Sequence, residues 1–171
     1  MKLSFSPALL AIACFSFLGH VTNGAADEPV HLFILSGQSN MAGMNPKAGF
    51  EPEAAALFPD ATVKYIKVAR GGQPIRLWVE KWNEIAKKHG IDPEKARAKD
   101  KQKGTLYYQP ILEQFGALLK QHPNPASVTF CWMQGERDAK EKLDAAYEDS
   151  LKQLIEDLRS DLRQPEMNFV I

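Results

Sequence analysis

The sequence predicts an α/β fold: a three-layer α/β/α sandwich with a central parallel sheet. Short apolar runs alternate with longer segments whose apolar residues recur at helical spacing. That alternation is typical of a parallel sheet covered by helices on both faces. Three of the four apolar runs also end in polar loops that contain glycine. In a parallel sheet such loops meet at the carboxyl edge, where ligands bind.

Four apolar runs are expected to form the strands of this sheet, because buried parallel strands read as nearly continuous apolar segments. The first three are followed directly by Ser-Gly, Arg-Gly-Gly and Gln-Gly. The expected strands are residues 30–35, 63–69, 128–133 and 167–171.

Three segments between these runs are predicted to be helices. The first spans residues 78–89 and ends before Gly90, a common helix stop. The others have apolar faces within residues 106–119 and 143–162, the last with a strongly charged opposite face. Residues 91–104 are dense in charge and have no apolar period, so we expect a solvated excursion rather than a charged binding surface.

The amino terminus has the pattern of a secretory signal peptide. Lys2 is followed by an apolar run at 8–18 and by small residues up to Ala26, after which we expect cleavage. The protein is therefore predicted to be secreted or periplasmic, with residues 27–171 as one domain. A membrane anchor is the alternative, whereas a lipoprotein site at Cys14 is disfavoured because residues 15–18 remain apolar.

Composition limits the classes of partner. The 171 residues are 44% hydrophobic and 25% charged, with a formal net charge of +0. A chain without excess charge has no long-range attraction to nucleic acid or to an anionic membrane. A small or neutral partner such as a sugar derivative is favoured, and oligomeric state stays open. Cys131, the one cysteine left after cleavage, is interpreted as a small buried apolar residue.

The first glycine-containing loop, residues 36–43, places Ser39 just after a buried strand and among small residues. Such a serine can project its hydroxyl into a cleft, and a helix beginning there aims N–H groups at developing negative charge. The alternative is that Ser39 or Asn40 only caps a helix.

The other two loops carry weaker signals when each is taken alone. In residues 69–75, Gly71 and Gly72 can present a backbone N–H, but they are also common in plain turns. In residues 132–139, Gln134 has an amide donor at the end of a strand. Glu136 and Asp138 are interpreted either as sugar-binding groups or as loop support and helix caps.

Together, the three loops resemble the conserved blocks of one enzyme family. Residues 37–43 (GQSNMAG), residues 71–73 (GGQ) followed by Trp78, and residues 132–139 (WMQGERDA) occur in order, each after an expected strand. They are similar to the sialate O-acetylesterase-like branch of the SGNH hydrolases, which includes acetylxylan esterases. The resemblance covers roughly residues 30–171 and implies an SGNH, flavodoxin-like fold.

The resemblance implies a serine esterase that removes acetyl groups from carbohydrates and needs no metal or other cofactor. Ser39 is the implied nucleophile. The N–H groups of Ser39 and Gly72 and the side chain of Gln134 are the implied oxyanion donors. The residues expected to bind substrate or support the loops are Gln38, Asn40, Gln73, Glu136 and Asp138.

A general base for Ser39 is not evident in the sequence. The family's histidine follows an aspartate near the carboxyl terminus, and none of the four histidines here fits that pattern. His31 begins a strand, while His89 and His122 lie at expected helix ends. Because the chain also ends on an apolar run, we expect it to lack the Asp-x-x-His block.

The sequence also bears on two other functions. A non-catalytic carbohydrate-binding protein of the same fold is the main alternative, with aromatic residues such as Trp78 and Tyr107 stacking on sugars. These aromatic residues are more readily interpreted as core. A nucleotide-binding domain is disfavoured, because the first loop lacks both G-x-G-x-x-G spacing and a G-K-[ST] ending.

Overall fold

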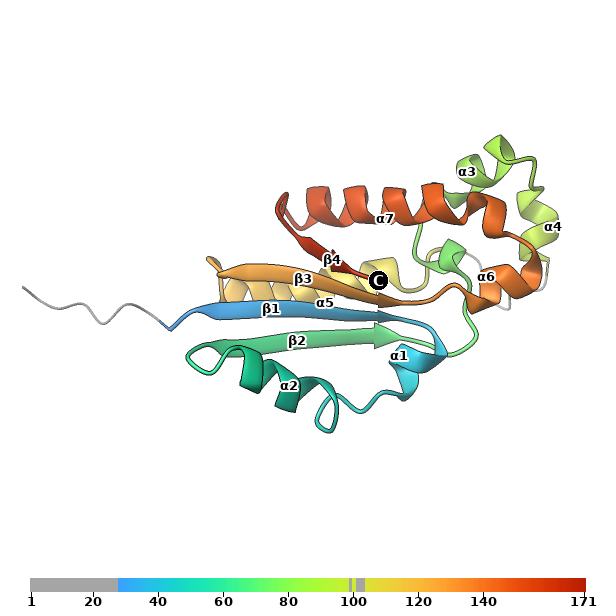
Figure 1. The fold of residues 1–171 in the computed structure, drawn as a ribbon. Helices are drawn as coiled ribbons and strands as arrows, with labels where there is room; N and C mark the ends of the chain where they lie inside the picture. Colours follow the sequence, from blue (N-terminus) through green and yellow to red (C-terminus); the bar gives the residue numbers. More distant parts are fainter. Residues whose placement is uncertain (1–27, 99, 101–103) are drawn as a thin grey trace, which may run out of the picture.

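A computed structural model describes residues 28–98, 100 and 104–171. The predicted signal peptide, residues 1–26, lies outside this part of the chain. The described residues form a four-stranded parallel sheet with the order β2–β1–β3–β4 (Figure 1). The strands are β1 (Val30–Gly37), β2 (Thr62–Ala69), β3 (Ser127–Met133) and β4 (Asn168–Val170). All four lie where the apolar runs predict them.

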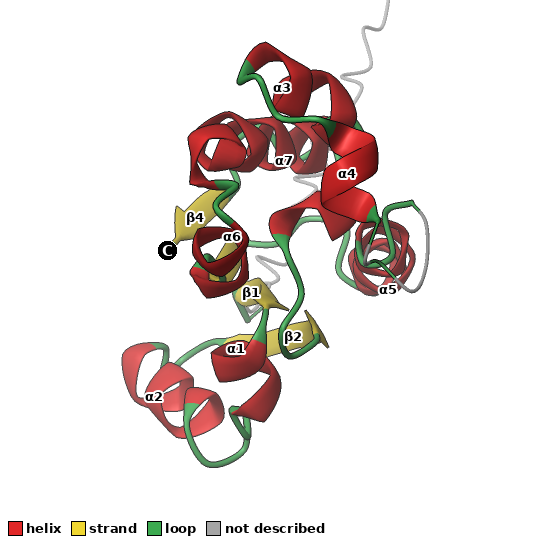
Figure 2. Cartoon of the chain, turned by 90° about the vertical axis from the view of Figure 1, so that its right-hand side faces the viewer, coloured by secondary structure: helices red, strands yellow, loops and turns green. Residues whose placement is uncertain are grey.

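Helices cover both faces of the sheet. Seen from its carboxyl edge, α1 and α2 lie on one side and α3, α5 and α7 on the other (Figure 2). The predicted three-layer α/β/α fold is therefore confirmed. The helices are α1 (Ser39–Gly43), α2 (Phe50–Leu57), η1 (Ile75–Leu77), α3 (Trp82–Lys88), α4 (Pro93–Arg97), α5 (Tyr108–Gln121), α6 (Glu136–Glu141), η2 (Asp144–Ala146) and α7 (Tyr147–Asp161). None of the helices described is long and apolar enough to cross a membrane.

The central strand β1 separates two apolar cores. Leu32 and Ile34 point into the larger core, which β1 shares with α3, α5 and α7. Phe33 and Leu35 point into the smaller core beneath α1 and α2. Because successive strand residues face opposite sides, a strand covered on both faces is apolar throughout. This explains the unbroken run that predicts β1.

The predicted helix at 78–89 is shorter than expected. Leu77, Trp78 and Val79 are all buried, and three consecutive residues cannot lie on one face of a helix. The chain instead forms the short η1, turns, and begins α3 at Trp82. Burial of residues 77–79 in the core therefore prevents the helix that the apolar spacing of residues 78–89 predicts from starting before Trp82.

The charged segment 91–104 is not simply a solvated excursion, and that prediction needs correction. It contains α4, whose first residue is Pro93 and whose cap is the side chain of Asp92, which accepts from the N–H groups of Glu94 and Lys95. An aspartate followed by proline is a common helix start. Farther along, the carboxylate of Asp100 binds a buried guanidinium described below.

Helix α2 is not predicted by the sequence at all. Its apolar residues lack a strong helical period, and only Ala54 is fully buried. Phe50 nevertheless packs edge-on against Phe33, with ring centroids 5.0 Å apart, and against Tyr65 at 5.3 Å. Tertiary packing, rather than an amphipathic pattern, holds this helix against the sheet.

Candidate active site

The three glycine-containing loops leave the sheet at one level. In the parallel register, Gly37 at the end of β1 pairs with Ala69 of β2 and with Met133 of β3. The loops that follow these residues therefore emerge side by side at the carboxyl edge, which Figure 2 views directly. This is the arrangement expected for a ligand site in a parallel sheet.

The first loop turns sharply because Gly37 lies against the backbone of β3. Gly37 has φ +140°, and a Cβ there would lie 2.1 Å from the carbonyl oxygen of Met133. The next N–H, that of Gln38, donates to the same carbonyl at 2.8 Å. Glycine is thus required both for its backbone conformation and for this close approach.

Ser39 begins α1 and is exposed at the carboxyl edge. Gln38 is the residue that precedes the helix, and no side chain caps it. The alternative that Ser39 or Asn40 serves as a helix cap is therefore not what the structure shows. Within the described residues, the N–H of Ser39 makes no hydrogen bond.

The second loop lies directly against the candidate nucleophile. A Cβ on Gly71 would be 3.9 Å from both Cα and Cβ of Ser39. Gly72 follows with φ +70°, a conformation that favours glycine. Its N–H has no hydrogen-bond partner among the residues described. The N–H groups of Ser39 and Gly72 are therefore both available as oxyanion donors, and that role stays a prediction.

Gln134 connects all three loops through its side-chain amide. Its Nε2 lies 2.5 Å from Oδ2 of Asp138, 3.0 Å from the carbonyl of Gln73 and 3.4 Å from Oε1 of Gln38. An amide nitrogen has two hydrogens for these three acceptors. Donation from Gln134 to an oxyanion therefore requires that one of these contacts be released.

Asp138 ties the third loop to the second. Its side chain is 1% exposed, and Oδ2 accepts from the backbone N–H of Ile75 at 2.9 Å as well as from Gln134. Burial raises the pKa of this carboxyl group, although both hydrogen bonds oppose the increase. The geometry agrees with the loop-support interpretation of Asp138.

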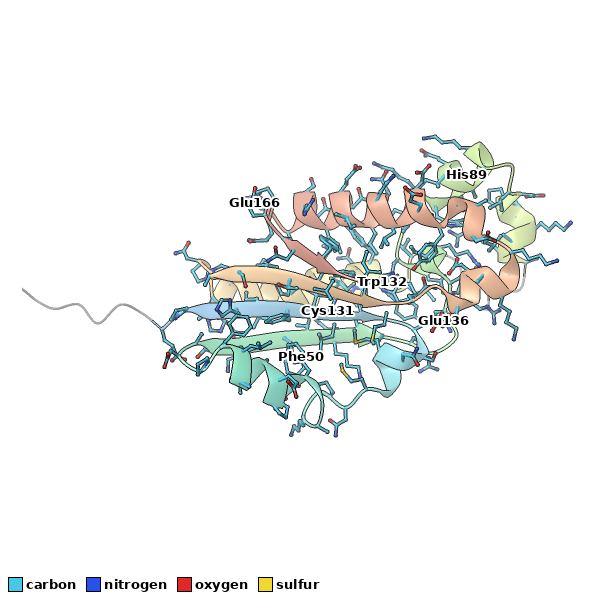
Figure 3. The ribbon with its side chains drawn as sticks, viewed as in Figure 1. Phe50, His89, Cys131, Trp132, Glu136 and Glu166 are labelled. Carbon is cyan, nitrogen blue, oxygen red and sulfur yellow. The ribbon has the colours of Figure 1, made fainter. Side chains whose placement is uncertain are left out.

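Glu136 connects the third loop to α1. Its Oε1 accepts from Nδ2 of Asn40 at 3.1 Å, and both residues are exposed. The backbone N–H of Arg137 also donates to Oε1 of Gln38, at 3.3 Å. Figure 3 shows Glu136 at this edge of the molecule. Neither acid caps α6, because that helix follows Gly135 and has no side-chain cap.

Aromatic residues support the third loop from the core. Trp132 donates from Nε1 to the hydroxyl of Tyr147 at 3.0 Å, and that hydroxyl donates to the carbonyl of Gln134 at 2.6 Å. Burial raises the pKa of Tyr147 to about 12. Trp78 and Trp82 are also fully buried. The tryptophans therefore form core, as the sequence favours, rather than exposed sugar platforms.

Arg76, a buried residue that the sequence patterns do not single out, connects the second loop to neighbouring segments. The guanidinium of Arg76 is fully buried and donates to both carboxylate oxygens of Asp100, at 2.6 and 2.9 Å. It also donates to Glu141 of α6 at 2.7 Å. Because Arg76 directly follows Ile75, the ion pairs join the second loop to α6 and to the segment after α4.

The three described histidines lie away from Ser39. His31 is at the amino end of β1, where its Nδ1 is 2.7 Å from the hydroxyl of Ser127. His89 follows α3 and lies 2.9 Å from Asp149, on the face of the sheet opposite α1 (Figures 1 and 3). His122 directly follows α5, which also lies on that face. No described histidine is therefore placed to act as the base.

Comparison with known proteins places the chain in a family. A family model described as carbohydrate esterase, sialic acid-specific acetylesterase, matches residues 44–171. The chain belongs to this carbohydrate esterase family. The resemblance drawn from the three loops is thereby confirmed at the level of the family. The match begins after the loop that carries Ser39 and includes the second and third loops.

A solved structure supports the fold. The X-ray structure of the Arabidopsis thaliana protein AT4G34215 is similar with a TM-score of 0.55 and 20% sequence identity, covering 82% of this chain and 72% of that one. At this identity the likeness bears on the α/β architecture alone. A search of curated protein sequences found no significant match to this chain.

Proposed function

We propose that this fold hydrolyses acetyl esters on carbohydrates, with Ser39 as the nucleophile. The observation that carries the proposal is the contact between the first and second loops. Gly71 lies against Ser39, and the N–H groups of Ser39 and Gly72 are without partners among the described residues. An exposed serine beside two available donors is the arrangement that acyl transfer requires. Membership of a carbohydrate esterase family supports the same reaction.

In the proposed reaction, Oγ of Ser39 attacks the acetyl carbonyl carbon while a base takes the hydroxyl proton. The carbonyl oxygen becomes an oxyanion held by the N–H groups of Ser39 and Gly72. The C–O bond to the sugar then breaks, and the base returns its proton to the departing sugar oxygen. Water attacks the acetyl-serine in the same way and releases acetate. Gln134 joins the oxyanion hole if its amide turns from the carbonyl of Gln73.

Among the described residues, no histidine is placed to act as the general base that this reaction needs. An unassisted serine hydroxyl is a weak nucleophile and needs a base at hydrogen-bond distance. We therefore retain the sequence-based hypothesis that an aspartate–histidine block, outside the residues present here, provides it. Loss of such a base lowers turnover by roughly 10⁴-fold or more in serine hydrolases.

A non-catalytic carbohydrate-binding role is the second candidate, favoured by the positions of His31, His89 and His122 away from Ser39. One experiment separates the two. Hydrolysis of p-nitrophenyl acetate and of acetylated xylo-oligosaccharides is measured for this chain, for a version continued through the expected block, and for Ser39→Ala in each. We expect turnover only in the continued version with Ser39 present. If both versions are folded and inactive, the binding role is favoured.

A further inference from the structure

An open groove lies between α4 and α6, beside the candidate active site and outside it. Its volume is about 670 Å³, within the range of small-molecule sites. Ile91, Ala96 and Leu143 contribute apolar side chains to its lining. An apolar surface of this kind packs against the C–H groups of a ligand rather than against an ion alone.

Three lysines add positive charge to the groove: Lys95 of α4, Lys140 of α6 and Lys142 directly after α6. Among the residues that the structure describes, none of the three forms an ion pair with a carboxylate. The chain as a whole has no net charge, so this cluster is a local feature rather than a reflection of composition. It favours an anionic ligand.

The two carboxylates that line the groove are already engaged. Asp92 accepts from the N–H groups of Glu94 and Lys95 as the cap of α4. Glu141 accepts from the buried guanidinium of Arg76 and from Arg137. The lining therefore carries four basic side chains, the three lysines and Arg137, against these two carboxylates, which leaves an excess of positive charge.

Lys142 occupies a backbone conformation that ordinarily selects glycine. Its φ is +58°, in the left-handed region, at the position that ends α6. Glycine or asparagine is favoured there, because a Cβ is strained in this conformation. A lysine at this position places a cation at the groove at some cost in stability, which is typical of a functional side chain.

The groove connects to the candidate active site through α6. This helix begins at Glu136, which contacts Asn40 beside Ser39. At 1.5 Å per residue, Lys140 lies only about 6 Å farther along the helix axis. Arg137 contributes to both the candidate active site and the groove, because its backbone N–H donates to Gln38 and it also lines the groove. A ligand of two or three sugar units in the groove would therefore approach Ser39.

We propose that the α4–α6 groove binds an anionic saccharide, whose carboxylates pair with the three lysines and whose C–H face packs on Ile91 and Leu143. This proposal rests on the proposed function for its choice of a saccharide. Binding in the groove does not depend on turnover, because neither Ser39 nor the proposed oxyanion donors Gly72 and Gln134 line it. On this account, the groove holds acidic sugar units next to the one that bears the ester.

The test is calorimetric titration with trigalacturonate, using maltotriose as the neutral match and tripolyphosphate as an anion without a sugar. We expect trigalacturonate alone to bind measurably, and more weakly as salt is raised. Lys140→Ala combined with Lys142→Gly should weaken binding about threefold to tenfold, the effect of losing two exposed ion pairs. The glycine suits the left-handed position, so this variant should remain folded.

The matched control is Lys47→Ala combined with Lys120→Ala, which removes two exposed lysines that do not line the groove. Its affinity for trigalacturonate should equal that of the unchanged protein. Equal loss in both double variants, or equal binding of maltotriose or tripolyphosphate, would overturn the proposal, as would no binding. Ser39→Ala should still bind trigalacturonate. Failure of the esterase proposal would therefore appear in the hydrolysis assay and leave the binding result unchanged.

Discussion

The carboxylate of Asp138 lies 2.9 Å from the backbone nitrogen of Ile75, across 63 positions of sequence, and accepts its hydrogen bond. The same oxygen accepts from Gln134. One buried side chain thus fixes the geometry of the second loop, which carries Gly72, relative to the third. Both loops carry implied oxyanion donors, so the spacing of those donors depends on Asp138.

Two replacements of Asp138 show whether its side chain stabilises the fold as a hydrogen-bond acceptor or through its negative charge. Asp138→Leu leaves the N–H of Ile75 buried without an acceptor, at a cost of about 1–3 kcal/mol. It also removes the shortest of the three contacts of the Gln134 amide. Asp138→Asn retains one acceptor oxygen, so we expect a much smaller loss. Urea unfolding measures both, with Asp144→Asn on the surface as the neutral control. Equal losses in the leucine and asparagine variants would contradict this reading.

The pH dependence of stability provides a second test of Asp138. Burial raises the pKa of its carboxyl group above 3.8, so the folded state binds its proton more tightly than the unfolded state does. The stability that this proton contributes is complete below the unfolded pKa and is lost as pH rises through the folded pKa. The protein should therefore lose stability relative to Asp138→Asn as pH rises above about 4. A free energy of unfolding that rises with pH relative to that of Asp138→Asn would contradict the inference.

Gly37→Ala should disrupt the site and the sheet together. The added Cβ would meet the carbonyl of Met133, in a backbone conformation unfavourable to alanine. We expect a loss of at least about 3 kcal/mol, or failure to fold. Gly116→Ala is the matched control, since a Cβ there meets nothing within 4 Å in α5 and should stabilise by up to about 1 kcal/mol. Thermal unfolding of the two variants tests this contrast.

Arg76→Met should destabilise strongly, because it leaves the carboxylates of Asp100 and Glu141 without their buried partner. Breaking a buried ion pair from one side typically costs about 3–5 kcal/mol. Lys81→Met is the comparison, since Lys81 is mostly exposed and lies 4.0 Å from Asp157. Its loss should be below about 1 kcal/mol. Similar effects in denaturant unfolding would show that the Arg76 network adds little.

The sheet and the carboxyl-edge loops are predictable from the sequence because both rest on local patterns. Apolar runs mark the four strands, of which β1 and β3 are largely buried, and Gly37 and Gly72 mark turns at which strands end. Parallel order then places the loop of Ser39 beside that of Gly72 without any knowledge of side chains. The residue roles assigned to Ser39, Gly72 and Gln134 remain predictions.

What the sequence does not reveal depends on contacts between distant segments. The bond from Ile75 to Asp138 and the ion pairs of Arg76 join residues that no spacing rule connects. Segment 91–104 is read as solvated because its charges give no apolar period, yet Asp100 is bound by a buried guanidinium. A proline after Asp92 was the available signal for α4.

The most direct test of the central claim is mass spectrometry of the protein after rapid acid quenching during reaction with p-nitrophenyl acetate. It uses a version continued through the proposed aspartate–histidine block, with Ser39→Ala as the control. We predict one acetyl group on the peptide that carries Ser39, and none there in the variant. Acetyl transfer to another residue, or turnover unchanged by Ser39→Ala, would contradict the assignment of Ser39 as the nucleophile.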